Sequence, residues 1–391
     1  MWLRIFIFTV LFNAVNAELV QLLAIWRHGD RAPGSLPYSK DQNGVTAWPR
    51  GWDQLTNIGI DQTYELGTFL RQRYVEGSQL FGPNFDKSKV FIQASDSERA
   101  LESAQSVATA LFPPIGNRVW NSNLSWQPVP IHSNGIDRQD TLLKPTSYDC
   151  PKYEKIKDDD QKMLASRFDS QFGDLFKFLT EMTGDSISGI NADGLNDIQR
   201  EIIHGLPQPN WVSGRVGNVS ILPTIMDIKR QMRLEEFNSD EKGKFRGGYL
   251  LNNWLSYLEA LRDGKKTFSA VLYSSHDGTL NALQSAMGMQ NGELVPYAAA
   301  ILLEVSRSSI NDDLKVQVFY RNTTQQPPYL MEIPGCSNPC PINQFLNVYE
   351  QMRIRNLTEM NELCGNDKTT STALNLSIFT IFSLFLAYYS C

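Results

Sequence analysis

Two arginines flank a histidine in the segment Arg27-His28-Gly29-Asp30-Arg31-Ala32-Pro33. Guanidinium groups donate forked hydrogen bonds that match the oxygens of a phosphate group. A neutral imidazole beside them can act as a nucleophile, and the nearby positive charge disfavours its protonation. The segment therefore predicts phosphoryl transfer, in which His28 attacks while Arg27 and Arg31 hold the equatorial oxygens.

Two later segments supply the other parts that this chemistry needs. Arg99 lies in residues 95–104 and can add a third guanidinium, and His276 can donate another hydrogen bond to the phosphoryl group. Asp277 follows His276 directly and is the candidate general acid for the leaving alkoxide. A His-Asp pair is common by chance. Its position after a predicted strand, downstream of the first motif, favours a catalytic role.

In their order along the chain, these segments resemble the motifs of the histidine acid phosphatases, beginning with the signature R-H-G-x-R-x-P. This family is a branch of the superfamily that also contains phytases and phosphoglycerate mutases. The resemblance spans about residues 18–365. It implies an acid phosphatase that hydrolyses phosphate monoesters through a phosphohistidine, with His28 and Asp277 as catalytic residues. Phosphate binding would fall to the remaining motif residues, which are Arg27, Arg31, Arg99 and His276.

Other functions find less support in the sequence. A phytase or another phosphatase of the same superfamily remains an alternative, whereas a glycolytic mutase is disfavoured by the signal peptide described below. A serine hydrolase would need an elbow such as G-x-S-x-G, which is absent. An inactive binding ectodomain would be supported by the loss of a motif residue, and none is lost.

Several further residues attract attention but receive no role. His132 and His204 lack neighbouring partner residues in the sequence, so each is expected to be a packed or surface histidine. Trp211 and Tyr148 could line a substrate mouth, but a core position is the favoured interpretation. No cofactor and no metal are predicted, because the four histidines are scattered and there is one close cysteine pair.

The elements that must position the motifs can be read from apolar patterns. Residues 18–26, 89–94 and 268–273 are apolar runs of strand length, and each ends at a motif. A helix is expected over residues 56–75, and Ser95-Asp96-Ser97-Glu98 matches a capping box that opens a helix through Leu111. Gly288 can end the helix after Asp277. Ligands of open α/β sheets bind beyond the carboxyl ends of strands, where these motifs would lie.

The predicted fold class is α/β, with a mostly parallel sheet flanked by helices in a phosphoglycerate mutase-like core. Strands at 298–305 and 314–320 would complete the sheet. Between residues 117 and 264 the pattern changes to helices, expected at 161–181, 222–237 and 249–261, with proline-rich joints. This stretch is interpreted as an inserted, mainly helical lobe within one domain over residues 18–365.

The composition is that of a folded protein of moderate size. The chain has 391 residues, of which 42% are hydrophobic and 20% charged, and its net charge is −6. It has no basic run, so nucleic acid is not a predicted partner. Residues 1–17 have a basic start, a short apolar stretch and a small-residue end, which together indicate a signal peptide. The mature chain would begin near Glu18 and enter the secretory pathway.

Four of the five cysteines are expected to pair in that oxidising compartment, which leaves Cys391 unpaired. Cys336 and Cys340 flank a turn-forming Ser-Asn-Pro segment that can bring them within bridging distance. Cys150 and Cys364 remain as a long-range pair. Glycosylation sequons occur at four asparagines, which are Asn123, Asn218, Asn322 and Asn356.

The C-terminal residues 366–391 read as a polar spacer followed by an uncharged tail from Ala373 to Cys391. Small residues, a polar spacer and an apolar tail are typical of a lipid-anchor signal. A spanning helix and a packed terminal element are the alternatives. The predicted location is therefore the cell surface, through a lipid anchor or a single spanning tail, or else the lysosome or the medium. The sequence leaves the physiological substrate and a homodimer open.

Overall fold

The structure is a computed structural model that describes residues 17–135 and 138–366. Residues 1–16 of the signal peptide predicted at residues 1–17, and the uncharged tail from Ala373, lie outside the described residues. Within them, no helix has both the length and the apolar character to cross a membrane.

The strands and helices follow one another as α/β units interrupted by a helical stretch. The strands are β1 (Ala17–Arg27), β2 (Val90–Ala94), β3 (Arg215–Val216), β4 (Val219–Ser220), β5 (Ala270–Ser275), β6 (Ala300–Ser308), β7 (Leu314–Arg321), β8 (Tyr329–Leu330) and β9 (Cys340–Pro341). The helices are α1 (Asn57–Arg71), α2 (Glu98–Leu111), α3 (Pro151–Thr183), α4 (Asp197–Ile203), α5 (Ile221–Glu235), α6 (Asp240–Arg262), α7 (Asp277–Ala286), α8 (Ile342–Val348) and α9 (Leu357–Cys364).

The main sheet has the strand order β2-β5-β1-β6-β7-β8, and β9 also pairs with β7. Strands β1 and β2 both run parallel to β5, whereas β6 is antiparallel to β1 and β7 is antiparallel to β6. The predicted α/β sheet flanked by helices is therefore confirmed, including the two late strands. The parallel strands are the three that lead into the sequence motifs.

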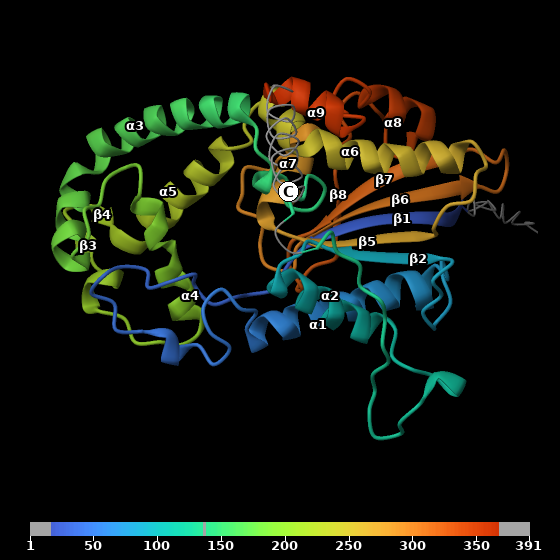
Figure 1. Cartoon of the computed structure of the whole chain (residues 1–391), viewed down its shortest axis with the longest axis horizontal. Coiled ribbons are helices and arrows are strands. Elements are labelled where there is room, and N and C mark those ends of the chain that lie inside the picture. The colour runs from blue at the N-terminus through green and yellow to red at the C-terminus, as the bar shows by residue number, and fades with distance from the viewer. Residues whose placement is uncertain (1–16, 136–137, 367–391) are drawn as a thin grey trace, which may run out of the picture.

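Helices cover both faces of this sheet (Figure 1). In β1 every residue from Leu22 to Trp26 is fully buried, and alternate side chains enter different cores. Leu23 and Ile25 pack with α6 and α7, whereas Leu22, Ala24 and Trp26 pack with α1 and α2. Burial on both faces explains why this strand is a continuous apolar run rather than an alternating one.

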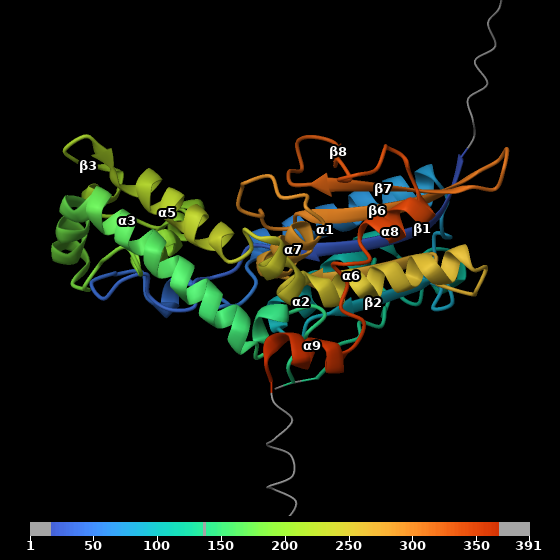
Figure 2. The same ribbon diagram turned by 90° about the horizontal axis from the view of Figure 1, so that it is seen from above.

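The helical lobe lies beside the carboxyl ends of the parallel strands (Figures 1 and 2). Helices α3, α4 and α5 pack there around their own core, which includes Phe168, Ile198 and Ile225. Helix α6 falls inside the range predicted for the lobe, but its Leu251 and Trp254 pack in a core of the sheet. The domain boundaries themselves stay a prediction.

The start of α2 corrects one local prediction. Ser97 is the residue before the helix, and its side chain makes no capping hydrogen bond. The hydroxyl of Ser95 lies 2.7 Å from Nε2 of His276. The capping-box assignment was therefore wrong, because Ser95 is engaged by a site residue, although the helix does end at Leu111 as expected.

Both predicted disulfides, Cys336–Cys340 and Cys150–Cys364, are present. The longer one joins residues 214 positions apart and fixes the last described helix, α9, to the residue before α3. Of the sequon asparagines, Asn322 is half-buried, and the others, Asn123, Asn218 and Asn356, are exposed. Their glycosylation stays a prediction.

Candidate active site

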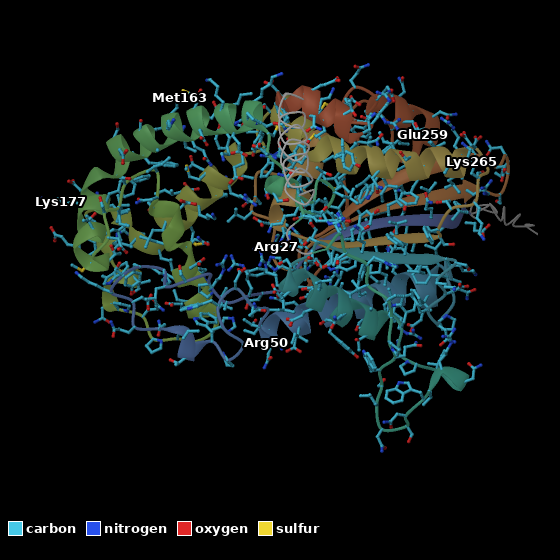
Figure 3. All side chains as sticks on the ribbon, viewed as in Figure 1. Arg27, Arg50, Met163, Lys177, Glu259 and Lys265 are labelled. Atoms are coloured by element: carbon cyan, nitrogen blue, oxygen red, sulfur yellow. A yellow bond between two sulfur atoms is a disulfide. The ribbon has the colours of Figure 1, made fainter. Side chains whose placement is uncertain are left out.

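The ends of three adjacent parallel strands bring the motifs together. Ser274 of β5 is paired with Trp26 of β1 on one side and with Ala94 of β2 on the other. The backbone N–H of His28 then donates to the carbonyl of Ser275 at 2.9 Å, which continues the ladder by one residue. Because the strands are parallel and in register, their following residues emerge at one edge of the sheet. Figure 3 shows Arg27 at this edge, next to the lobe.

The loop that carries His28 is pressed against the first turn of α1. A Cβ added at Gly29 would lie 2.1 Å from the carbonyl oxygen of Gly59, and one at Gly59 would lie 2.1 Å from the carbonyl oxygen of Asp30. Thr56 caps α1 through Gly59 N–H, and its hydroxyl also donates to the Asp30 carboxylate at 2.6 Å. The close approach of two backbones explains the glycine in the motif and fixes the position of His28.

The hydrogen bonds of His28 define its tautomer. Nδ1 lies 2.7 Å from the carbonyl oxygen of Gly29, which can only accept, so Nδ1 carries the proton. Nε2 lies 3.3 Å from Nε of Arg99, which can only donate, so Nε2 holds a lone pair. His28 is buried and lines the cavity described below. This assignment from the hydrogen-bond network leaves an unprotonated nitrogen that can act as a nucleophile.

The charge state of His28 fits that tautomer. Burial lowers the pKa of His28 well below its usual value, and Arg27, His276 and Arg99 lower it further. The imidazole is therefore neutral in the unliganded site, and the guanidinium groups act in the direction expected from the sequence, after the larger effect of burial.

The arginines are held by contacts from segments outside the motifs. Asp53 bridges two of them, with Oδ1 3.0 Å from Arg31 Nη1 and Oδ2 2.6 Å from Arg99 Nη1. The guanidinium of Arg27 lies 3.9 Å from the centre of the Tyr297 ring, and its Nη1 donates to the Val295 carbonyl at 2.6 Å.

Arg27 also has an unused donor. Its Nε is buried and has no hydrogen-bond partner among the residues that the structure describes. A buried donor without a partner is costly, so the position of Arg27 is maintained at the expense of this hydrogen bond.

His276 is neutral as well. Burial and then Arg99 lower the pKa of His276 to about 3. One ring nitrogen is engaged by Ser95, and the two site histidines have ring centres 5.4 Å apart. When Ser95 donates to Nε2, Nδ1 carries the proton and can donate to a phosphoryl oxygen.

Asp277 is the first residue of α7, and its Oδ2 accepts a hydrogen bond from Arg233 Nε at 2.9 Å. Burial alone would raise the pKa of Asp277, but Arg233 and then Arg27 outweigh it and hold that pKa well below its usual value. Within the described chain Oδ1 makes no hydrogen bond, so one oxygen is held and the other is free. Arg233 comes from α5 in the lobe and was not predicted from the sequence.

The site opens into a cavity of about 470 Å³ between the sheet and the lobe. All six predicted residues line it. Its walls also include residues that the sequence analysis did not select, among them Lys144, Asn196, Arg200, Met226, Lys229, Arg233, Val295 and Tyr297. A cavity of this size can hold a phosphoryl group together with a leaving group.

Of the other residues considered from the sequence, His204 contacts the segment that carries His28. His204 Nε2 lies 2.6 Å from Oδ2 of the buried Asp30, so the end of α4 is joined to the His28 loop. His132 stacks on Phe91 away from the cavity, and Tyr148 and Trp211 pack in hydrophobic clusters. No group of three or more metal-ligating side chains occurs in the part of the chain that the structure describes.

Comparison with known proteins shows which family the chain resembles. The sequence profile of the histidine phosphatase superfamily (branch 2) matches residues 18–173. The chain is 31% identical to the lysosomal acid phosphatase of Bos taurus over 358 residues, covering 90% of this chain and 82% of that protein. It is 29% identical to the prostatic acid phosphatase of Homo sapiens, with 85% of each chain covered.

Solved structures agree in fold. The phytase from Citrobacter braakii superposes with a TM-score of 0.66 and 15% identity, covering 88% of this chain and 99% of that one. A phytase of Klebsiella gives a TM-score of 0.64 at 17% identity, covering 87% and 97% of the two chains. At these identities the likeness concerns the fold alone.

Proposed function

Because the chain belongs to branch 2 of the histidine phosphatase superfamily, we propose which role each site residue has in the acid phosphatase reaction. The protein is a phosphoric monoester hydrolase of this family, and its substrates are phosphate monoesters. His28 is the nucleophile and Asp277 the proton donor. The phosphoryl oxygens are bound by the other four predicted residues, Arg27, Arg31, Arg99 and His276.

The proposed reaction has two steps. Nε2 of His28 attacks phosphorus, the P–O bond to the leaving group breaks, and the leaving oxygen takes a proton from Oδ1 of Asp277. Water then attacks the phosphohistidine, the P–N bond breaks, and the Asp277 carboxylate accepts the proton of the water. The arginines stabilise the charge on the equatorial oxygens throughout both steps.

The observation that carries this proposal is the pair of contacts on the His28 ring. Gly29 holds the proton on Nδ1 and Arg99 faces the lone pair of Nε2, so the attacking nitrogen lies beside the guanidinium groups that would hold the phosphoryl group. A binding ectodomain without catalysis would not need this tautomer. The replacements of His28 and Asp277 described in the Discussion test the assignment.

A homodimer is proposed from an exposed apolar loop between α2 and α3, which projects from the sheet side of the molecule (Figure 1). Four apolar side chains of this loop are exposed, and Trp120 Nε1 donates to the Trp126 carbonyl at 2.8 Å, which joins the two ends of the stretch; the four are Val119, Trp120, Leu124 and Trp126. Clustered exposed apolar side chains of this kind mark interaction surfaces.

We expect sedimentation equilibrium of the secreted protein to give twice the chain mass, and Leu124→Asp to shift it to the monomer. Val45→Asp, at an exposed apolar position elsewhere, should leave the mass unchanged. A wild-type monomer at micromolar concentration, with and without enzymatic removal of glycans, would contradict the proposal.

We also propose that the protein traverses the secretory pathway and is held on the cell surface by a lipid. Two disulfides and relatives named lysosomal and prostatic acid phosphatases support the first part. The second part rests on the sequence of residues 366–391. Phosphatidylinositol-specific phospholipase should release phosphatase from expressing cells. Retention on the membrane, with a mature mass that includes residues 373–391, would instead establish a spanning segment.

A further inference from the structure

The pairing of Asp277 with Arg233 conflicts with the proposed role of Asp277. A proton donor must carry a proton before the reaction, whereas a guanidinium 2.9 Å away stabilises the carboxylate. Its position as the first residue of α7 also favours the ionised form, because the helix N-terminus is positive. Asp277 can therefore donate a proton only if the binding of substrate weakens the interaction between the Arg233 guanidinium and the Asp277 carboxylate.

Other charged groups around Asp277 do not remove this conflict. Arg27 approaches from the end of β1 and also lowers the pKa of Asp277, whereas the neutral His28 beside it carries no charge that could raise that pKa. Glu236 opposes them indirectly, because its Oε2 accepts from Arg233 Nη1 at 2.6 Å and shares the guanidinium. The free protein thus keeps Asp277 ionised.

Arg233 retains one nitrogen that no described protein group occupies. Nε binds Asp277 and Nη1 binds Glu236, whereas Nη2 makes no hydrogen bond among the described residues. Nη2 lies against the backbone at Gly278, where an added Cβ would be 2.5 Å from it. Arg233 lines the cavity, so an anionic group inside it can reach the guanidinium.

The cavity wall around Arg233 is positively charged. Lys229 is one helical turn earlier on α5, and Arg200 and Lys144 line the same cavity. Lys229 and Arg200 are paired with Asp193 and Asp197, which do not line the cavity, whereas Lys144 makes no ion pair among the described residues.

Arg27, Arg31 and Arg99 are sufficient to hold one phosphoryl group, so the cations of the lobe add to what a simple monoester needs. Among the described residues, Asp277 is the one carboxylate that lines the cavity.

We propose that Arg233 is a positioning and specificity-determining residue that couples the proton on Asp277 to a second anionic group of the substrate. A phosphate on the leaving group binds Arg233 together with Lys229, partly neutralises the guanidinium, and so allows Asp277 to hold a proton. The favoured substrates are phosphate monoesters whose leaving group carries a further phosphate. This inference rests on the proposed role of Asp277 as proton donor.

The wild-type enzyme provides the first test, with fructose 1,6-bisphosphate and fructose 6-phosphate as probes. After division by two for its two phosphates, kcat/KM for the bisphosphate should be about tenfold higher, the gain from one added charge-assisted hydrogen bond. Activity that needs protonated Asp277 is lost as pH rises through its pKa. The decrease of kcat at alkaline pH, here called the alkaline limb, should therefore occur at a higher pH for the bisphosphate than for fructose 6-phosphate.

p-Nitrophenyl phosphate calibrates these profiles, because its leaving group needs no proton, and the decrease of its kcat at alkaline pH reports ionisation of the substrate phosphate alone. Equal kcat/KM values and coincident limbs for the two sugar phosphates would overturn the inference without any variant.

The second test replaces the arginine. In Arg233→Gln, the ratio of kcat/KM for the bisphosphate to that for fructose 6-phosphate should fall close to one. The alkaline limb of kcat for fructose 6-phosphate should move to higher pH, because the Asp277 carboxylate loses its neighbouring cation. Arg233→Lys, which keeps the charge, should restore part of the preference. Arg230→Gln, on the same helix but outside the cavity lining, should leave both readouts at their wild-type values.

An unchanged preference and limb in Arg233→Gln would sink the inference. The role of Asp277 as proton donor and its coupling to Arg233 can be rejected independently. If Asp277→Asn does not distinguish alkyl from aryl phosphates, the donor assignment itself fails, whereas success there with a null result at Arg233 rejects only the coupling.

Discussion

Replacement of His28 by alanine is expected to lower kcat/KM for p-nitrophenyl phosphate by about 10⁴-fold or more, because the group proposed to attack phosphorus is removed. The wild-type protein, quenched in alkali during turnover of ³²P-labelled substrate, should retain label that is stable to base and released by acid. The variant should retain none. The variant lacks the proposed nucleophile but keeps Arg27, Arg31 and Arg99, which would still bind the phosphoryl group.

His132→Ala is the matched control, since His132 stacks on Phe91 outside the cavity and should leave turnover near the wild-type value. Circular dichroism and thermal unfolding of both variants separate catalysis from folding. Near wild-type turnover in folded His28→Ala protein would contradict the assignment of His28 as the nucleophile.

Replacement of Asp277 by asparagine is expected to reduce kcat/KM for an alkyl phosphate such as glycerol 2-phosphate by about 10²–10⁴-fold. An alkoxide is a poor leaving group and needs a proton in the transition state. The loss on p-nitrophenyl phosphate should be less than about tenfold, because p-nitrophenolate leaves without protonation. Steady-state kinetics with both substrates over a common pH range provide the measurement.

Asp240→Asn serves as the comparison, because Asp240 also lies in the first turn of a helix, α6, but does not line the cavity. Asp240→Asn should lower kcat/KM only slightly, and by the same factor for the alkyl and the aryl phosphate. A loss of equal size on alkyl and aryl phosphates in Asp277→Asn would instead assign Asp277 to positioning of the phosphoryl group.

The parts of the fold that the sequence predicted are those with local signals. The parallel strands are apolar runs that end at polar motifs, and β6 and β7 are apolar enough to be recognised as well. The register of β2, β5 and β1 then brings Arg99, His276 and His28 together without further information. All six selected residues line one cavity for this reason.

The remaining site residues depend on tertiary packing, which leaves no local pattern. Asp53 lies in the loop before α1, and its contacts to Arg31 and Arg99 exist only after that loop folds back. Arg233 is one of several cations on an amphipathic helix, and its partner is 44 positions away. His204 meets Asp30 across 174 positions. Nothing in the neighbouring residues distinguishes these side chains from solvated ones.

The contact between Gly29 and Gly59 limits how this protein can change during evolution. In most cores, a larger side chain at one position can be offset by a smaller one at its neighbour, so the two drift together. Here each added Cβ would collide with the partner's backbone or with that of Asp30, and a backbone has no smaller alternative. Neither glycine can therefore compensate for a change in the other. Descendants that keep the nucleophile in place should keep both glycines, and a lineage that loses one should be free to lose His28 as well.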